Sequence, residues 1–147
     1  MDKNTNLNLY VCKIEYADIK TILRMREGTL PTRIKIDFTS GNDFISIYST
    51  PGKMVFAEPT TKTNAGYSYN QKLNGFYPGD EEQNNSDLNN LTKNSFVVRF
   101  TYNNGIQKLI GSLVNPCSFF STYDTSKKGS DFSFECTSNE PSYIYES

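Results

Sequence analysis

Apolar and polar residues alternate along most of the chain with a period of two. Because successive side chains of a strand point to opposite faces, this alternation is typical of strands with one buried face. It predicts strands at residues 7–14, 33–38, 44–48, 54–57, 67–73, 96–102, 106–113 and 132–137, and a short one at 143–145. We therefore expect a sheet built mainly from antiparallel strands.

Three short stretches carry residues that favour tight turns. Asn104-Gly105 separates two predicted strands and is a strong hairpin signal, because both residues tolerate positive φ. Residues 40–43 favour a second turn, and residues 50–53, with Pro51-Gly52 at their centre, favour a type II turn. The last two turns predict that the three strands between residues 33 and 57 form a meander.

Residues 18–27 follow a helical pattern instead. Asp18 is suited to cap a helix, and Ile19, Ile22 and Leu23 then fall at helical spacing before Gly28. We expect one short helix here, although isoleucine and threonine also allow an extended segment.

Residues 78–94 form the most polar part of the chain, and we expect a long loop there. A loop of this length inside a compact domain is usually functional or mobile. Two hypotheses follow: an arm that orders only against a neighbouring molecule, or a loop that is simply solvated.

The composition agrees with a β-rich domain. The 147 residues include 10 Tyr and 10 Phe, and 45 are Asn, Ser or Thr, whereas alanine occurs only three times. Aromatic residues and Thr favour pleated surfaces, Asn and Ser favour turns, and alanine is the best helix former. We expect one all-β domain over residues 1–147, an antiparallel β-sandwich or distorted barrel of about 7–9 strands.

Charge and hydropathy narrow the range of partners. The net charge of −1 gives no field that would attract nucleic acid or an anionic membrane. No apolar run approaches the roughly 20 residues of a membrane span. The first residues also lack the basic start and apolar core of a secretory signal. We expect a protein made in a cytosol, with neither a specific nucleic acid nor a membrane as its partner.

The side chains required by most catalytic sites are missing from the sequence. There is no histidine, which excludes Ser-His-Asp and Cys-His arrangements and imidazole zinc sites. The acidic residues at 80–87 lack the spacing of a calcium loop, and Gly52-Lys53 lacks the upstream glycine of a phosphate-binding loop. We therefore expect no enzyme, no catalytic residue, no cofactor and no metal ion.

Three cysteines, Cys12, Cys117 and Cys136, are far apart in the sequence. They match neither a CxxC metal motif nor a complete disulfide framework, so buried free thiols are the simplest interpretation. Cys117 and Cys136 could be neighbours in adjacent strands, and a reducing compartment would leave them as thiols.

Aromatic side chains are the remaining candidates for function. Those between residues 67 and 77 could stack on sugars or bases, or they could be ordinary half-buried strand residues. The absence of tryptophan weakens the sugar-binding interpretation, because sugar platforms use large aromatic faces. The residues singled out as a possible interface are Tyr67, Tyr69, Phe76, Tyr77, Val97, Tyr143 and Tyr145.

The last third of the chain shows a specific order of elements. A strand ends in Ile110-Gly111, a short polar stretch reaches Pro116, and an alternating strand follows through Phe119. Residues 123–129, the strand at 132–137 and residues 139–145 complete the order. Over residues 95–147 this order resembles small β-rich proteins encoded in the structural gene clusters of Bacteroidetes bacteriophages and prophages.

The resemblance implies a component of the virion, in the tail or the head-to-tail neck, and it brings no catalytic residues. Such a protein would be made in the bacterial host cytoplasm and would form a homo-oligomer, expected as a ring, that contacts other virion proteins. Exposed sheet edges would supply the contacts, because their unpaired N–H and C=O groups can extend a sheet across subunits. The alternatives are a carbohydrate- or receptor-binding β-module and, last, an enzyme or enzyme inhibitor.

Overall fold

A computed structural model describes residues 9–79 and 82–147. Over these residues the chain forms twelve strands, one α-helix and one 3-10 turn, so the all-β class is confirmed with more strands than the 7–9 expected. The elements are β1 (Val11–Asp18), the turn Ile19–Thr21, β2 (Ile22–Glu27), β3 (Arg33–Phe38), β4 (Ile45–Ile47), β5 (Val55–Ala57), β6 (Thr60–Thr63), β7 (Gly66–Pro78), α1 (Glu82–Leu91), β8 (Ser95–Tyr102), β9 (Gln107–Ile110), β10 (Cys117–Asp124), β11 (Gly129–Ser138) and β12 (Tyr143–Tyr145).

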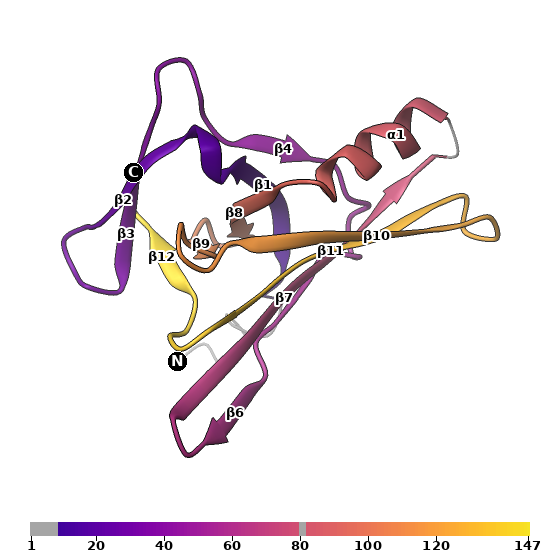
Figure 1. Ribbon diagram of the computed structural model, residues 1–147. Helices are drawn as coiled ribbons and strands as arrows, with labels where there is room; N and C mark the ends of the chain where they lie inside the picture. The colour runs from indigo at the N-terminus through magenta and orange to yellow at the C-terminus, as the bar shows by residue number, and fades with distance from the viewer. Residues whose placement is uncertain (1–8, 80–81) are drawn as a thin grey trace.

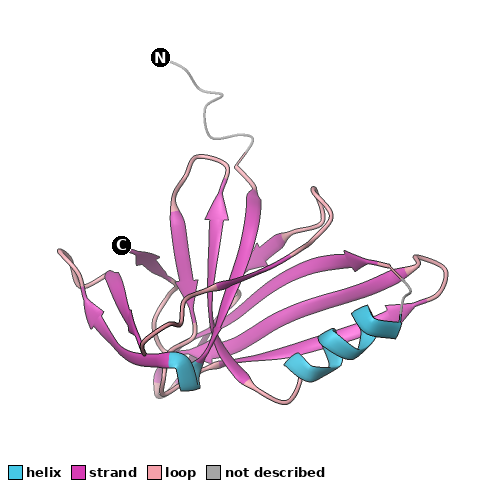
Figure 2. Ribbon diagram, turned by 90° about the horizontal axis from the view of Figure 1, so that it is seen from above, coloured by secondary structure: helices cyan, strands magenta, loops and turns pink. Residues whose placement is uncertain are grey.

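The described strands form one continuous sheet that branches at β8 and at β7 (Figure 1). The main order is β2-β3-β12-β9-β8-β10-β11-β7-β5, while β1 pairs with β8 and β4, and β6 pairs with β7. Only β12 and β3 run parallel among these pairs. Strands β7, β10 and β11 lie side by side across the molecule with α1 beside them (Figures 1 and 2). Strands β5 and β6 flank β7, whereas β2, β3 and β12 lie at the other end of the sheet order.

Strand β8 is covered on both faces. Phe96, Val98 and Phe100 enter the larger of two hydrophobic cores, and Val97 enters the smaller one with Ala17. Val97 is 0% exposed, so its prediction as an interface residue is wrong. Alternation separates two faces of a strand, but it cannot tell water from a second core when both faces carry apolar residues.

Aromatic rings from β8, β10 and β11 fill the larger core. Phe96, Phe119 and Phe132 surround Phe134, with ring centroids 5.8, 5.0 and 6.2 Å from its own. These edge-to-face contacts are the preferred geometry of aromatic pairs. Gly75 of β7 passes beneath the ring of Phe132, where a Cβ atom would lie 2.4 Å from a ring carbon.

The helix predicted at residues 18–27 is wrong. Asp18 does act as a cap, because its carboxylate accepts a hydrogen bond from the Lys20 amide, but the turn that follows has only three residues. Strand β2 then begins at Ile22 and pairs with β3. Its arginines Arg24 and Arg26 are two residues apart, on one face of the strand, and both bind Asp37 of β3. β-branched residues and this cross-strand pairing outweigh the helical spacing.

The only α-helix of the described residues lies in the region predicted as a polar loop, 78–94. Residues 80 and 81 fall outside the described residues, and α1 follows directly. Leu88 is 4% exposed in the larger core, and Leu91 packs against the same core. Two leucines three residues apart therefore dock an otherwise polar helix. None of the described helices is long and apolar enough to cross a membrane.

The predicted meander is also wrong, although its turn at residues 50–53 is present. Gly52 has φ of 85°, and the Lys53 amide donates to the Thr50 carbonyl at 3.1 Å. However, β3 pairs with β2 and β12, β4 pairs with β1, and β5 pairs with β7. The loops between these three strands are long enough to carry each strand to a different partner.

The hairpin at Asn104-Gly105 is confirmed, with Thr101 opposite Gln107. Gly105 alone takes a positive φ, at 91°, and its amide donates to the Tyr102 carbonyl. The Asn104 side chain instead accepts a hydrogen bond from the Ile106 amide at 3.0 Å. The chain therefore turns through a loop of three residues rather than the two expected.

Candidate functional site

Strand β4 leaves part of the β1 backbone without a partner on one side. β4 pairs with β1 only from Ile14↔Ile47 to Tyr16↔Ile45, whereas β8 pairs with the whole length of β1 on its other side. Among the described residues, no strand pairs with residues 11–13 on the β4 side. An edge of this kind presents backbone N–H and C=O groups that can accept a further strand.

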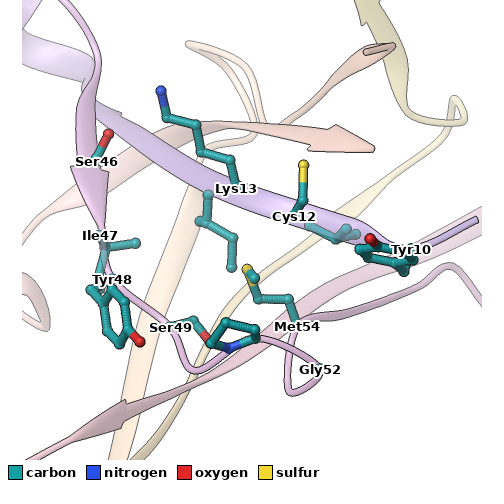
Figure 3. Close-up of a pocket in the computed structure, with 12 residues that line it drawn as sticks. Tyr10, Cys12, Lys13, Ser46, Ile47, Tyr48, Ser49, Gly52 and Met54 are labelled. Carbon is teal, nitrogen blue, oxygen red and sulfur yellow. The ribbon is translucent and has the colours of Figure 1, made fainter. Parts of the chain in front are cut away.

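A cavity of about 570 Å³ opens at this unpaired edge. Figure 3 shows it between β1 and the loop that joins β4 to β5, with Tyr10 at one end and Tyr48 at the other. Both tyrosines are strongly exposed, at 56% and 57%. The cavity is lined by Tyr10, Val11, Cys12, Lys13, Ile14, Ser46, Ile47, Tyr48, Ser49, Pro51, Gly52 and Met54.

A second hollow of about 470 Å³ also borders β4. Leu88 and Leu91 of α1 line it together with Tyr77, and it shares Ser46, Ile47 and Tyr48 with the first cavity. β4 therefore contributes residues to both hollows. We call this region the β4 surface and define it as Tyr10, the residues of β4, Tyr48 and the linings of the two hollows.

Hydrogen bonds to β7 hold the loop of the β4 surface in place. The Ser49 hydroxyl accepts a hydrogen bond from the Phe76 amide at 2.9 Å, and the Thr50 amide donates to the Phe76 carbonyl at 2.9 Å. Ser49 is itself 5% exposed. The cavity wall is therefore fixed in the free protein, which lowers the entropy that a binding partner would have to overcome.

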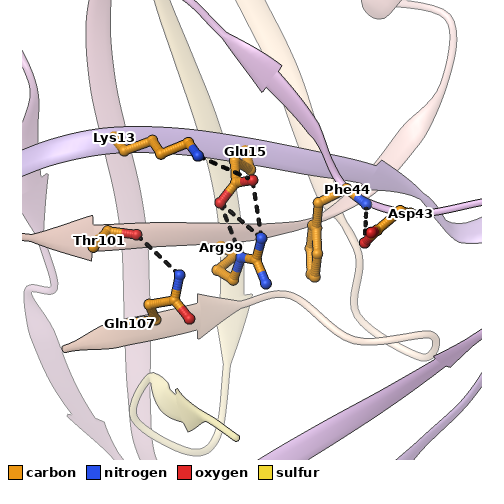
Figure 4. Close-up of polar contacts among 7 residues, drawn as sticks. All are labelled: Lys13, Glu15, Asp43, Phe44, Arg99, Thr101 and Gln107. Atoms are coloured by element: carbon orange, nitrogen blue, oxygen red, sulfur yellow. Dashed lines mark hydrogen bonds and ion pairs between the residues drawn. The ribbon is translucent and has the colours of Figure 1, made fainter. Parts of the chain in front are cut away.

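The ion pair of Glu15 and Arg99 lies beside the β4 surface and contacts the residue that precedes β4 (Figure 4). Arg99 of β8 faces Glu15 of β1 and donates hydrogen bonds to both carboxylate oxygens, at 3.0 and 2.9 Å. The guanidinium also lies over the rings of Phe44 and Tyr145, 4.1 and 4.7 Å from their centroids. Phe44 directly precedes β4, so this stack sets where β4 starts.

The polar side chains that line the first cavity either already have a partner within the protein or stand alone, without a second reactive group from the described residues beside them. The Lys13 ammonium lies 3.7 Å from the carboxylate of Glu15, and the Ser49 hydroxyl accepts the hydrogen bond from the Phe76 amide. Cys12 is an exposed free thiol. In the part of the chain that the structure describes, no group of three acidic, cysteine or histidine side chains could hold a metal ion. What the cavity offers is apolar area, tyrosine hydroxyls and backbone edge groups.

The aromatic residues predicted from β7 do not form one surface. Tyr67 is 54% exposed near the β6–β7 turn, with the Lys62 ammonium 5.7 Å from its ring centroid, and Tyr69 is half-buried. Phe76 and Tyr77 lie at the other end of the strand, about 30 Å from Tyr67 at roughly 3.3 Å per residue. Of these residues Tyr77 alone belongs to the β4 surface.

The predicted C-terminal tyrosines are packing residues of the smaller core. Tyr143 and Tyr145 are both half-buried there, and burial is the main reason that the pKa of the Tyr143 hydroxyl is raised. Among the exposed apolar residues that the prediction missed, Tyr10, Ile45 and Tyr48 belong to the β4 surface. Each lies in or next to a predicted strand, so only the strand pairing reveals that they share an open edge.

Comparison with known proteins gives no relative. No family model matches the chain, and neither the curated proteins nor the solved structures contain a match to it.

Proposed function

We propose that this chain is a non-enzymatic structural protein that acts through protein–protein contacts at the β4 surface. The observation that carries the proposal is the open backbone edge of β1 beside a preformed, largely apolar cavity. In strand addition, backbone hydrogen bonds supply affinity, and a pocket that takes alternate side chains supplies specificity.

The occupant that we propose is β2 of a second copy of the chain. Among the described strands, β2 ends the sheet order and pairs only with β3, so its outer backbone groups are available. It carries Leu23, which is 64% exposed and suited to an apolar cavity. A contact between two different edges is head-to-tail, and repeating it closes a ring when the rotation allows.

The setting that we propose is a bacteriophage particle, in the tail or the head-to-tail neck. It rests on the resemblance of residues 95–147 to phage structural proteins, and the net charge of −1 agrees with protein rather than nucleic acid as the partner. Other virion proteins would bind the remaining edges of the ring. The proposed localisation is the virion, after synthesis in the host cytoplasm.

One observation favours a second function, a carbohydrate- or receptor-binding module. Tyr67 is exposed on the β6–β7 hairpin and lies beside Lys62, an arrangement that could stack on a sugar ring. Phe76 and Tyr77 lie too far away to extend this platform, and the neighbouring Tyr69 is half-buried. A glycan array with the wild type and Tyr67→Ala tests it.

Complementary variants test the head-to-tail contact. Sedimentation velocity over a range of concentrations should show wild-type oligomers, and Tyr48→Lys and Leu23→Lys should each be monomeric. Because each variant keeps one intact edge, an equimolar mixture of the two should form a dimer and nothing larger. Tyr67→Lys, an equally exposed tyrosine elsewhere, should assemble as the wild type does. A wild type that stays monomeric at every concentration would overturn the proposal.

A further inference from the structure

The β10–β11 ladder brings two cysteines together at its end. Ser118 pairs with Glu135 and Phe119 with Phe134, so the next step of the same register sets Cys117 opposite Cys136. Directly opposed residues in antiparallel strands have Cα atoms about 4.5 or 5.5 Å apart. Disulfides span Cα separations of about 4.4–6.8 Å, so strand neighbours in this register have the spacing that a disulfide needs.

Both thiols lie on one face of the sheet and contact each other. Cys117 is a member of the larger core, and Cys136 packs against that core. A hydrogen bond joins the two side chains, and both cysteines are free thiols. Gly111 leaves room for the first thiol, because a Cβ atom there would lie 2.9 Å from the Cys117 sulfur.

The two thiols differ in access and in acidity. Cys117 is 0% exposed, and its burial raises the pKa of the thiol. Cys136 is partly exposed and lines a cavity of about 350 Å³, and the hydrogen bond from Cys117 lowers the pKa of its thiol. Its sulfur is positioned by Gln71, whose side-chain oxygen accepts a hydrogen bond from it at 3.0 Å. Cys136 is therefore the thiol that an external reagent can reach.

We propose that Cys117 and Cys136 form a redox site, a dithiol that a low-molecular-weight disulfide oxidises to an intramolecular disulfide. The inference is independent of the β4 surface. The Cys136 thiol loses its proton to solvent, and the thiolate attacks one sulfur of the small disulfide, which leaves a mixed disulfide and one small thiolate. Cys117 then attacks the Cys136 sulfur and releases the second small thiol, which takes the Cys117 proton. Two protein thiols are oxidised and one small disulfide is reduced to two thiols.

Lys72 adds a reason for such a reagent to enter the cavity. Its side chain lines the same cavity as Cys136, and its ammonium lies 3.7 Å from the carboxylate of Glu135 at the rim. Oxidised glutathione carries both carboxylate and ammonium groups, which this ion pair of Lys72 and Glu135 can bind, whereas the apolar core around Cys117 admits no charged reagent.

The test uses the full chain, reduced and then incubated folded with oxidised glutathione. After alkylation of the remaining thiols, intact mass spectrometry should show loss of two hydrogen atoms and a single label, and peptide mapping should join Cys117 to Cys136. Cys12→Ser should form the same disulfide and carry no label. Cys117→Ser should trap glutathione on Cys136, and Cys136→Ser should lower modification of Cys117 at least about tenfold, because a buried thiol is inert.

The peptide map of the wild type tests the proposal without any substitution, so the test stands even if a variant fails to fold. A map in which glutathione resides on Cys12 alone, with Cys117 and Cys136 both alkylated only after unfolding, would overturn the proposal. A disulfide between Cys117 and Cys136 that forms in denaturant and not in the folded chain would overturn it as well.

Discussion

Glu15 and Arg99 face each other across the β1–β8 pair and are joined by two hydrogen bonds of 3.0 and 2.9 Å. Their side chains are 8% and 15% exposed, and the guanidinium lies over the rings of both Phe44 and Tyr145, which themselves meet edge to face. The pair connects the first strand, the central strand, the start of β4 and the C-terminal strand. It is the polar link between the smaller core and the β4 surface.

We expect Arg99→Ala to lower the free energy of unfolding by about 3 kcal/mol, because it leaves the Glu15 carboxylate buried without its main partner. Urea denaturation measures the change. Arg24→Ala is the matched control: this arginine also binds a carboxylate, but it is 67% exposed, so its loss should change the free energy by less than about 1 kcal/mol. Equal effects of the two substitutions would show that burial does not govern the Glu15–Arg99 pair.

The lowered pKa of the Asp37 carboxylate leads us to expect that the protein loses stability in acid. Hydrogen bonds from Arg26 and Arg24 lower its pKa from the ordinary value of 3.8 to about 2. Because the folded pKa lies below the unfolded one, the contribution is fully present above about pH 4 and is lost as the pH falls towards 2.

Thermal melts of the wild type and Asp37→Asn between about pH 5 and 2 check this expectation. The variant should be less stable at the upper end, and its melting temperature should fall less than that of the wild type on acidification. Added salt should shrink the difference, since the arginines are exposed. Parallel curves for the two proteins would contradict the assignment.

Local sequence patterns predict most of the strands but not their partners. The alternation at Arg33–Phe38 and the Asn104-Gly105 turn are local signals, and both are confirmed. The pairing of Tyr16 with Ile45, and of Val11 with Tyr102, depends on contacts far apart in the chain. The β4 surface arises from such pairings, so no window of the sequence contains it.

The helix is predicted in the wrong segment for the same reason, namely that contacts far apart in the chain decide the local conformation. Residues 18–27 have helical spacing, yet the cross-strand pairing of Arg24 with Asp37 makes Ile22–Glu27 a strand. In α1 the intrinsic preference for helix is weak, and burial of Leu88 decides its conformation. Tertiary contacts override local propensity in both segments.

Docking of α1 is expected to depend on Leu88, which is 4% exposed. Leu88→Ala should lower the free energy of unfolding by about 2–3 kcal/mol, because it removes buried methyl groups and leaves a cavity. Leu23→Ala is the control, since that leucine is 64% exposed and its loss should be nearly neutral. Limited proteolysis should then cut the Leu88→Ala chain between residues 82 and 91 before the wild type. Resistance equal to that of the wild type would mean that α1 is held by other contacts.

Gly75 makes a sharp test of the packing between β7 and β11. It is buried, and a Cβ atom there would lie 2.4 Å from the Phe132 ring, so Gly75→Ala should lower the free energy of unfolding by about 1–3 kcal/mol. Its φ is not positive, which leaves steric overlap as the cause. Replacing Phe132 by the smaller leucine should therefore cost less in the Gly75→Ala background than in the wild type. Chemical denaturation of the two single variants and the double variant completes the cycle. If the losses in free energy of unfolding are strictly additive, the Phe132 ring and a side chain at position 75 do not compete for the same space.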